Sequence, residues 1–281
     1  MKRLVVCTDG SAYGLEACRY ASWLSKKSGA EILTLYVSDL RQFEVPVVAD
    51  VTGSFGLQPY QEITSQIEKV EEKRAEAIRR ASLSVFEEEA VADRASFLHR
   101  IGILGETVNE LHEEGDLVVM GKRGENANFE TEHLGSSLER VIRSSSAPVW
   151  VTSRKFRPIR RILFAYDGGG SCRKALHFIA NAGWIGDLDL HLVSVTDAKS
   201  EAERSGDLME AGEVLSQHGH SFESLLLEGD VEETIADYVK SHSIDMMVMG
   251  AYGHSRIRYL LIGSTTTAMI RICQIPVLCF R

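Results

Sequence analysis

The sequence predicts two tandem α/β domains, each a doubly wound, five-stranded parallel sheet flanked by helices. Its 281 residues are about twice the length of a typical domain. Its second half repeats the first, as a comparison of KRLVVCTDGSAYGLEA with RRILFAYDGGGSCRKA shows. In each half, short apolar runs alternate with helical patterns, as in sheets whose parallel strands are joined by helical crossovers.

The repeat extends over nearly the whole chain. Asp9 matches Asp167 and Val37 matches Val195 at an offset of 158, whereas DLVVMGKRG matches DMMVMGAYG at 129 and LGSS matches IGST at 128. The first copy therefore carries about 30 more residues between Val37 and Gly121. Copies of this length are globular domains rather than solenoid units. The charged, proline-containing segment SRKFRPIR separates domains expected at 1–154 and 158–281.

Each copy contains five short apolar runs that we interpret as strands. Several are continuously apolar, as expected for strands covered on both faces. The runs of the first copy are Leu4–Thr8, Ile32–Val37, Phe97–Leu104, Leu117–Met120 and Val149–Val151. Those of the second copy are Ile162–Tyr166, Leu188–Val195, Phe222–Leu227, Met246–Met249 and Val277–Phe280. The last runs of the two copies are expected to pair with each other, because exposed apolar edge strands are a liability.

Helical periodicity fills the intervals between these runs. Leu176, Ile179, Ala180 and Gly183 follow an i, i+3, i+4, i+7 spacing, and Val231–Val239 follows it less strictly. In the first copy, an irregular stretch over 39–66 with two prolines and two glycines precedes a long helix expected over 64–89. The second copy shortens this region to about 197–217. We expect the charge run EKVEEKRAEAIRR of the long helix to form a solvated face.

Composition excludes several classes of protein. A net charge of −9 argues against a general nucleic-acid binder, which needs clustered Lys and Arg. Five cysteines without a C-x-x-C pair argue against a disulfide framework or a zinc ribbon. The apolar run at the N-terminus is too short for a signal peptide, and no run is long enough to span a membrane. We therefore expect a cytoplasmic protein.

Glycine-rich loops follow the first and fourth predicted strands of each copy, at the sheet edge where open α/β sheets bind ligands. Glycine lets backbone N–H groups approach an anion, and a helix N-terminus adds free N–H groups and partial positive charge. The segment Gly263-Ser264-Thr265 at the start of a helix combines these features. The alternative is that these glycines only make turns and Ser264 only caps the helix.

The spacing of the second copy, G-2x-G-9x-G-S-T, resembles the nucleotide-binding signature of the universal stress protein family. An Asp after the first strand, V-M-G at the end of the fourth and Pro-Val at the fifth strengthen the resemblance, which covers nearly the whole chain. It implies five-stranded parallel sheets with helices on both sides. Some members bind ATP and others lack a nucleotide.

The resemblance also implies binding residues. In the second domain an adenine nucleotide would contact Asp167 and the Val195 backbone, and its ribose and phosphates would contact Gly250, Gly253, Gly263, Ser264 and Thr265. The equivalents in the first domain are Asp9, Val37, Gly121, Gly124, Gly135, Ser136 and Ser137.

The first copy departs from the signature. Ten residues instead of nine separate Gly124 from Gly135, and they include three glutamates and His133. Carboxylates beside a triphosphate are unfavourable, although Lys122 and Arg123 could offset them or coordinate phosphate. We therefore expect the second domain to be the nucleotide site. Three alternatives stay open for the first domain: its site is degenerate, it is purely structural, or it is specific for another ligand.

We expect an ATP-binding stress-response regulator, with or without Mg²⁺, rather than an efficient enzyme. The chain lacks a G-x-x-x-x-G-K-[ST] loop and a G-x-S-x-G elbow, and no general base accompanies the glycine loops. We predict no catalytic or metal-binding residues, and we expect His218 and His220 to lie in a surface turn. Two alternatives are a non-nucleotide scaffold acting through protein partners and an adenylyl transferase, for which no H-x-G-H motif is present. Formation of homo-oligomers is left open.

Overall fold

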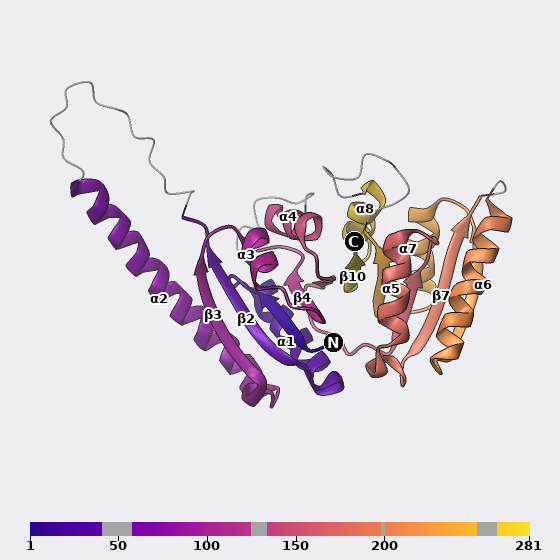
Figure 1. The fold of residues 1–281 in the computed structure, drawn as a ribbon, viewed down its shortest axis with the longest axis horizontal. Helices are drawn as coiled ribbons and strands as arrows, with labels where there is room; N and C mark the ends of the chain where they lie inside the picture. The colour runs from indigo at the N-terminus through magenta and orange to yellow at the C-terminus, as the bar shows by residue number, and fades with distance from the viewer. Residues whose placement is uncertain (41–57, 125–133, 198–199, 252–262) are drawn as a thin grey trace, which may run out of the picture.

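The computed structural model describes residues 1–40, 58–124, 134–197, 200–251 and 263–281, and the side chains of 58–64 are not described. Within these residues, ten strands form one continuous sheet in the order β3-β2-β1-β4-β5-β10-β9-β6-β7-β8. Two similar halves lie side by side along this sheet (Figure 1).

The elements of the first half alternate as the repeat predicts. Its strands are β1 (Arg3–Cys7), β2 (Glu31–Ser38), β3 (Ala95–Ile101), β4 (Asp116–Gly121) and β5 (Val149–Thr152). Its helices are α1 (Ala12–Ser28), α2 (Gln58–Glu88), η2 (Ala92–Arg94), α3 (Leu104–Leu111) and α4 (Ser136–Ser144).

The second half has the same order of elements. Its strands are β6 (Arg161–Ala165), β7 (Asp189–Thr196), β8 (Phe222–Glu228), β9 (Met246–Gly250) and β10 (Val277–Phe280). Its helices are α5 (Gly170–Ala180), η3 (Gly183–Ile185), α6 (Glu201–Gln217), α7 (Val231–Ser241) and α8 (Ser264–Ile272).

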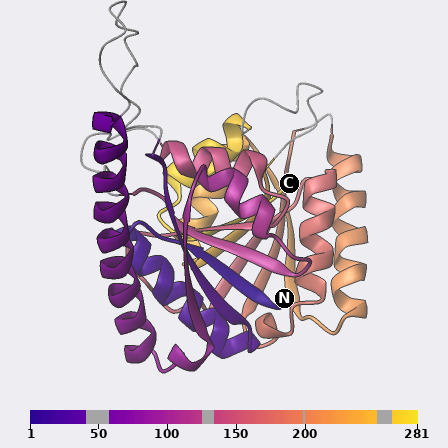
Figure 2. The ribbon, with the colours of Figure 1, turned by 60° about the vertical axis from the view of Figure 1, so that its left-hand side comes forward.

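Each half is a doubly wound domain. All strand pairs within a half are parallel, and the central strand, β1 or β6, lies between the second and fourth strands of its copy. Helices flank the strands on both sides (Figure 2). One buried cluster packs α1, α2, α5 and α6 against one face of the sheet, and another packs α3, α4, α7 and α8 against the opposite face. The predicted fold class is confirmed.

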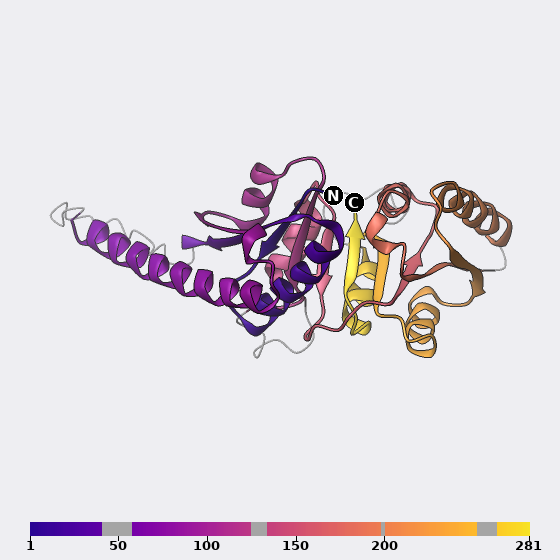
Figure 3. The same ribbon diagram turned by 90° about the horizontal axis from the view of Figure 1, so that it is seen from below.

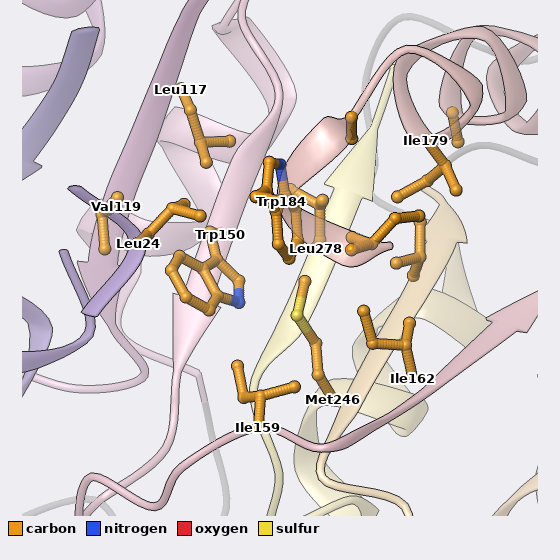
Figure 4. Close-up of a cluster of buried hydrophobic side chains, with 14 of the residues drawn as sticks. Leu24, Leu117, Val119, Trp150, Ile159, Ile162, Ile179, Trp184, Met246 and Leu278 are labelled. Atoms are coloured by element: carbon orange, nitrogen blue, oxygen red, sulfur yellow. The ribbon is translucent and has the colours of Figure 1, made fainter. Parts of the chain in front are cut away.

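The two halves meet at an antiparallel pairing of β5 with β10, in which Val277 lies opposite Val151 and Leu278 opposite Trp150. The two strands run together through the middle of the molecule (Figure 3). The Trp150 side chain is fully buried at this junction beside the second domain's Leu278 and Trp184 (Figure 4). The expected pairing of the last strands is confirmed, and it leaves neither strand as an exposed edge.

Three expectations from the sequence need correction. The expected strand 97–104 ends at Ile101, because Gly102 adopts a positive φ of 155° and α3 begins at Leu104. Helix α2 begins at Gln58, earlier than expected, because Pro59 needs no intrahelical N–H bond in a first turn. The charge run is not wholly solvated, since Glu71 within it is only 5% exposed.

The cysteines Cys7, Cys18, Cys172, Cys273 and Cys279 are all buried free thiols. Among the described residues, no helix is both long and apolar enough to cross a lipid bilayer.

Candidate functional site

A cavity of about 710 Å³ lies at the carboxyl ends of β1, β2 and β4 in the first domain. It sits where the strand order reverses on either side of β1, which is where doubly wound sheets bind ligands. Every residue predicted for the first domain lines it: Asp9, Val37, Gly121, Gly124, Gly135, Ser136 and Ser137. The structure therefore brings together residues that are up to 128 positions apart in the chain (137 − 9).

The N-terminus of α4 lines the cavity. Gly135 is the N-cap and supplies no side-chain cap, and Ser136 and Ser137 form the first turn against the cavity. Arg123 and Arg140 line the same cavity. Uncapped N–H groups, hydroxyls and guanidinium groups form a site that favours an anion such as phosphate.

Two glycines at this edge have different surroundings. A Cβ on Gly121 would lie 2.8 Å from the Tyr13 Cβ and 3.0 Å from the Tyr13 carbonyl oxygen, so the contact of β4 with α1 requires glycine. At Gly135 a Cβ would meet nothing closer than 3.5 Å, and its φ of −58° suits any residue. Packing therefore explains Gly121, whereas a Cβ at Gly135 would make only ordinary van der Waals contacts, with the Lys122 carbonyl oxygen and the Arg123 Cα.

Asp9 is held between two loops. Its Oδ1 accepts a hydrogen bond from the Ser11 backbone N–H at 3.0 Å. A Cβ on Gly124 would lie 2.6 Å from its Oδ2, so the carboxylate lies directly against the glycine loop. This arrangement fixes a negative group in the cavity wall next to β1.

Lys122 points away from the cavity. Its ammonium group donates a hydrogen bond to the Cys273 carbonyl at the C-terminus of α8, in the other domain. Burial lowers the pKa of Lys122 to about 8. Of the two cations that the sequence suggested for phosphate, Arg123 lines the cavity and Lys122 ties the glycine loop to the second domain.

The sequence analysis missed a buried polar cluster in the wall of the cavity. The Glu71 carboxylate, on α2, accepts hydrogen bonds from the hydroxyls of Tyr36 and Ser38 on β2, each at 2.6 Å. His99 on β3 lies 2.8 Å from the Ser38 hydroxyl. Arg74 lies 3.9 Å from the second carboxylate oxygen of Glu71 and 5.8 Å from the centre of the Tyr36 ring.

This cluster keeps Glu71 ionised. Burial alone would raise the pKa of Glu71, but the hydrogen bonds from Ser38 and Tyr36 and the charge of Arg74 outweigh it and lower the pKa. Burial and the bond to Glu71 raise the pKa of Tyr36 to about 12. A signal for Glu71 exists in the sequence, because it begins the buried helical series 71, 75, 78, 82 and 85 of α2.

The equivalent edge of the second domain keeps both kinds of glycine but has different polar contacts. Gly263 caps α8 without a side chain, like Gly135, and a Cβ on Gly250 would lie 3.1 Å from both Ser171 Cβ and Cys172 Sγ, like Gly121. Arg204 on α6 donates to the Asp167 carbonyl. Asp167, Val195, Gly250, Gly263, Ser264 and Thr265 are all described, whereas Gly253 lies outside the described residues. A cavity of about 710 Å³ in this domain lies at the opposite edge, near Arg161 and His191.

The two histidines of the H-x-H pair contact backbone carbonyls. His218 Nδ1 lies 2.9 Å from the Val214 oxygen, and His220 Nε2 lies 2.8 Å from the Ala180 oxygen. Within the described ranges, no group of three His, Cys, Asp or Glu side chains is placed to hold a metal ion.

Comparison with known proteins assigns the family. The model of the universal stress protein family matches the chain twice, over residues 1–153 and 158–281. The chain belongs to this family. The curated universal stress protein Slr1230 of Synechocystis sp. is 38% identical over 287 residues and covers 100% of both chains. This universal stress protein is thus a tandem, two-domain member.

A solved structure of the family shares its fold. A universal stress protein of Archaeoglobus fulgidus matches with a TM-score of 0.66 at 21% identity, covering 99% of this chain and 96% of that one. Another universal stress protein, solved in complex with cAMP, matches with a TM-score of 0.38 at 19% identity and covers 44% of this chain and 98% of its own.

Proposed function

We propose that this universal stress protein binds an adenine nucleotide, ATP with or without Mg²⁺, and acts as a regulator in the stress response rather than as an efficient enzyme. The observation that carries the proposal is the cavity of the first domain, which collects all seven predicted residues around the free N-terminus of α4. In solution, a nucleotide would act by shifting the conformation or assembly of the protein.

The charges of the cavity suit a nucleotide. Arg123, Arg140 and the N-terminus of α4 line the cavity and could bind a polyphosphate. Asp9 and the backbone of Val37 lie beside the ends of β1 and β2, where the nucleoside would bind. Hydroxyl and amino groups of a nucleoside are hydrogen-bond donors that a carboxylate accepts.

The second domain is our second candidate site. Its sequence keeps the nine-residue spacing between glycines, and its Gly263 has the same open cap geometry as Gly135. The sequence favours this domain, whereas the geometry of the described cavity supports the first domain. The proposal therefore includes both sites and is tested for each separately.

Turnover is expected to be slow. Backbone N–H groups and hydroxyls stabilise ground-state phosphates, and uniform binding of ground and transition states does not raise kcat. We expect far less than about one turnover per second, the low end of typical enzymes.

Isothermal titration calorimetry with Mg-ATP on the full chain and on Gly135→Val, Gly263→Val and the double variant tests the proposal. We expect micromolar affinity, about −8 kcal/mol. A Cβ at either position would come no closer than 3.5 Å to the described chain, so we expect both variants to keep their fold. Gly206→Val, at an exposed glycine of α6 with open space around it, is the matched control.

The outcomes separate the sites. Loss of binding in Gly135→Val assigns the first domain, and loss only in Gly263→Val assigns the second. If the folded wild-type chain binds no adenine nucleotide, the proposal is wrong and the scaffold alternative replaces it.

A further inference from the structure

Glu71 is held in one orientation by hydroxyl groups. Both the Tyr36 and the Ser38 hydroxyl donate to the same oxygen, Oε2, at 2.6 Å. The residue is 5% exposed, so the carboxylate has little room to turn. Two hydrogen bonds to one oxygen leave the other oxygen, Oε1, in a fixed direction.

The donors of this cluster follow from proton counting. A serine hydroxyl carries one proton, and Ser38 donates it to Glu71. His99 Nε2, 2.8 Å from the Ser38 oxygen, must therefore be the donor in that contact. The chain His99 to Ser38 to Glu71 delivers hydrogen bonds to the carboxylate from β2 and β3 and keeps it an acceptor.

The oxygen that remains is Oε1. Arg74 Nη1 lies 3.9 Å from it, beyond hydrogen-bond distance. Glu71 and Arg74 both line the cavity of the first domain. The cavity wall thus presents an ionised acceptor beside a guanidinium donor.

Glu71, beside Arg74, contacts β2, the strand whose Val37 is the expected neighbour of the nucleoside. Ser38, which bonds to Glu71, directly follows Val37, whose backbone is the expected neighbour of the base. The residues expected to hold phosphate, Ser136 and Ser137, belong to a different element, α4.

We propose that Glu71 and Arg74 read the Watson–Crick edge of the base in the first domain, and that they select adenine over hypoxanthine. The inference rests on the proposed function. The 6-amino group of adenine would donate a hydrogen bond to Glu71 Oε1, and adenine N1 would accept one from the Arg74 guanidinium. Hypoxanthine in the same pose would place its O6 acceptor against the carboxylate.

The second domain has no such reader among its described residues. The position of Tyr36 is taken by Ser194, whose hydroxyl is buried without a hydrogen-bond partner in the described part of the chain. The position of Ser38 is taken by Thr196, which donates to the Asp197 carbonyl. The specificity is therefore a property of the first domain, created by α2.

The test compares ATP with inosine triphosphate, which carries hypoxanthine, on chains with Gly263→Val so that only the first domain is titrated. The chain with Glu71 should bind ATP at least about tenfold more tightly than inosine triphosphate, as expected for a hydrogen bond to a charged group. In Glu71→Gln, the amide oxygen can accept from Tyr36 and Ser38, and the amide NH₂ then replaces Oε1 as a donor. In this variant the ratio of the affinity for ATP to that for inosine triphosphate should fall to about one or below one.

Glu72→Gln, one position along α2 and exposed, is the matched control and should keep the preference. Purine riboside triphosphate, which lacks the 6-amino group, gives a second measurement that needs no change at Glu71. It should bind about tenfold more weakly than ATP.

The results separate this inference from the proposed function. If Gly135→Val abolishes ATP binding but the preference is the same in Glu71→Gln, and purine riboside triphosphate binds as ATP does, the base-reading inference is wrong and the nucleotide site stands. If the first domain binds no ATP, both are wrong.

Discussion

Gly121 in the first domain and Gly250 in the second occupy the same place at the end of the fourth strand of each copy, and each lies against the helix that follows the first strand. The walls of the two edges differ. In the first domain α2 spans 31 residues and brings Glu71 and Arg74 to a cavity. In the second, α6 spans 17 residues and brings Arg204 to the backbone of the loop that holds Asp167.

This difference shows which parts of a duplicated fold are constrained. The close contact of strand and helix leaves no room for a side chain, so both copies keep glycine there. The helix over the second and third strands only needs an apolar face, so its length and polar residues can diverge. New chemistry then arises at the wall of the site while the sheet is unchanged.

The largest effect is expected at the junction of the halves. Trp150 is fully buried and packs edge-on against Tyr20 at 5.5 Å. Trp150→Ala should lower the free energy of unfolding by about 3–5 kcal/mol. Urea denaturation followed by circular dichroism measures this loss.

Trp150→Phe is the control, since the Trp150 Nε1 has no hydrogen-bond partner among the described residues and its loss breaks none. A loss below about 1 kcal/mol in Trp150→Ala would mean that the halves are stable without this junction.

The next effect separates the two kinds of glycine. Gly121→Val and Gly250→Val should each lower the free energy of unfolding by about 1–3 kcal/mol, because the new side chain overlaps α1 or α5, the helix that follows the first strand of each copy. Gly135→Val and Gly263→Val should change it by less than about 0.5 kcal/mol. Chemical denaturation of the four variants checks this. Equal losses in all four would show that packing does not distinguish Gly121 and Gly250 from Gly135 and Gly263.

The sequence predicts the scaffold well, because strand positions depend on local apolar runs that both copies share. It predicts the collection of Asp9, Gly121 and Ser136 at one edge, because parallel strands place their carboxyl ends together. It does not predict the direction of Lys122, which depends on how the two domains meet. It also misses Glu71, since a charged residue in a charge run is assigned to solvent unless the register of α2 against β2 is known.

A smaller effect concerns the phosphate end. Arg140 lines the cavity of the first domain, whereas the matching residue of the second copy is Ala268. Arg140→Ala should weaken ATP binding to the first domain about tenfold, or 1.4 kcal/mol, by removing a charged donor. Calorimetry at two salt concentrations in the Gly263→Val background measures it. Unchanged affinity and salt dependence would place the phosphates away from Arg140.

An effect of similar size, seen only as a dependence on pH, tests the tie between the domains. The second copy has Ala251 where the first has Lys122, so this lysine contact with the other domain belongs to the first copy. Burial lowers the pKa of Lys122 to about 8 in the folded chain, whereas an unfolded lysine keeps its proton to about pH 10.4. Between these pH values the unfolded chain binds more protons, so this group makes the folded state more stable as pH rises.

Lys122→Met should remove that rise. Relative to wild type, the variant should lose ~1–2 kcal/mol of unfolding free energy between pH 8 and pH 10.5, less than the full pKa difference implies because the side chain is partly exposed. Urea denaturation at several pH values measures the two curves, and Lys69→Met, on an exposed position of α2, is the control. Parallel curves for wild type and Lys122→Met would show that Lys122 keeps an ordinary pKa, and the loop would then be tied to the second domain by a solvated rather than a buried charge.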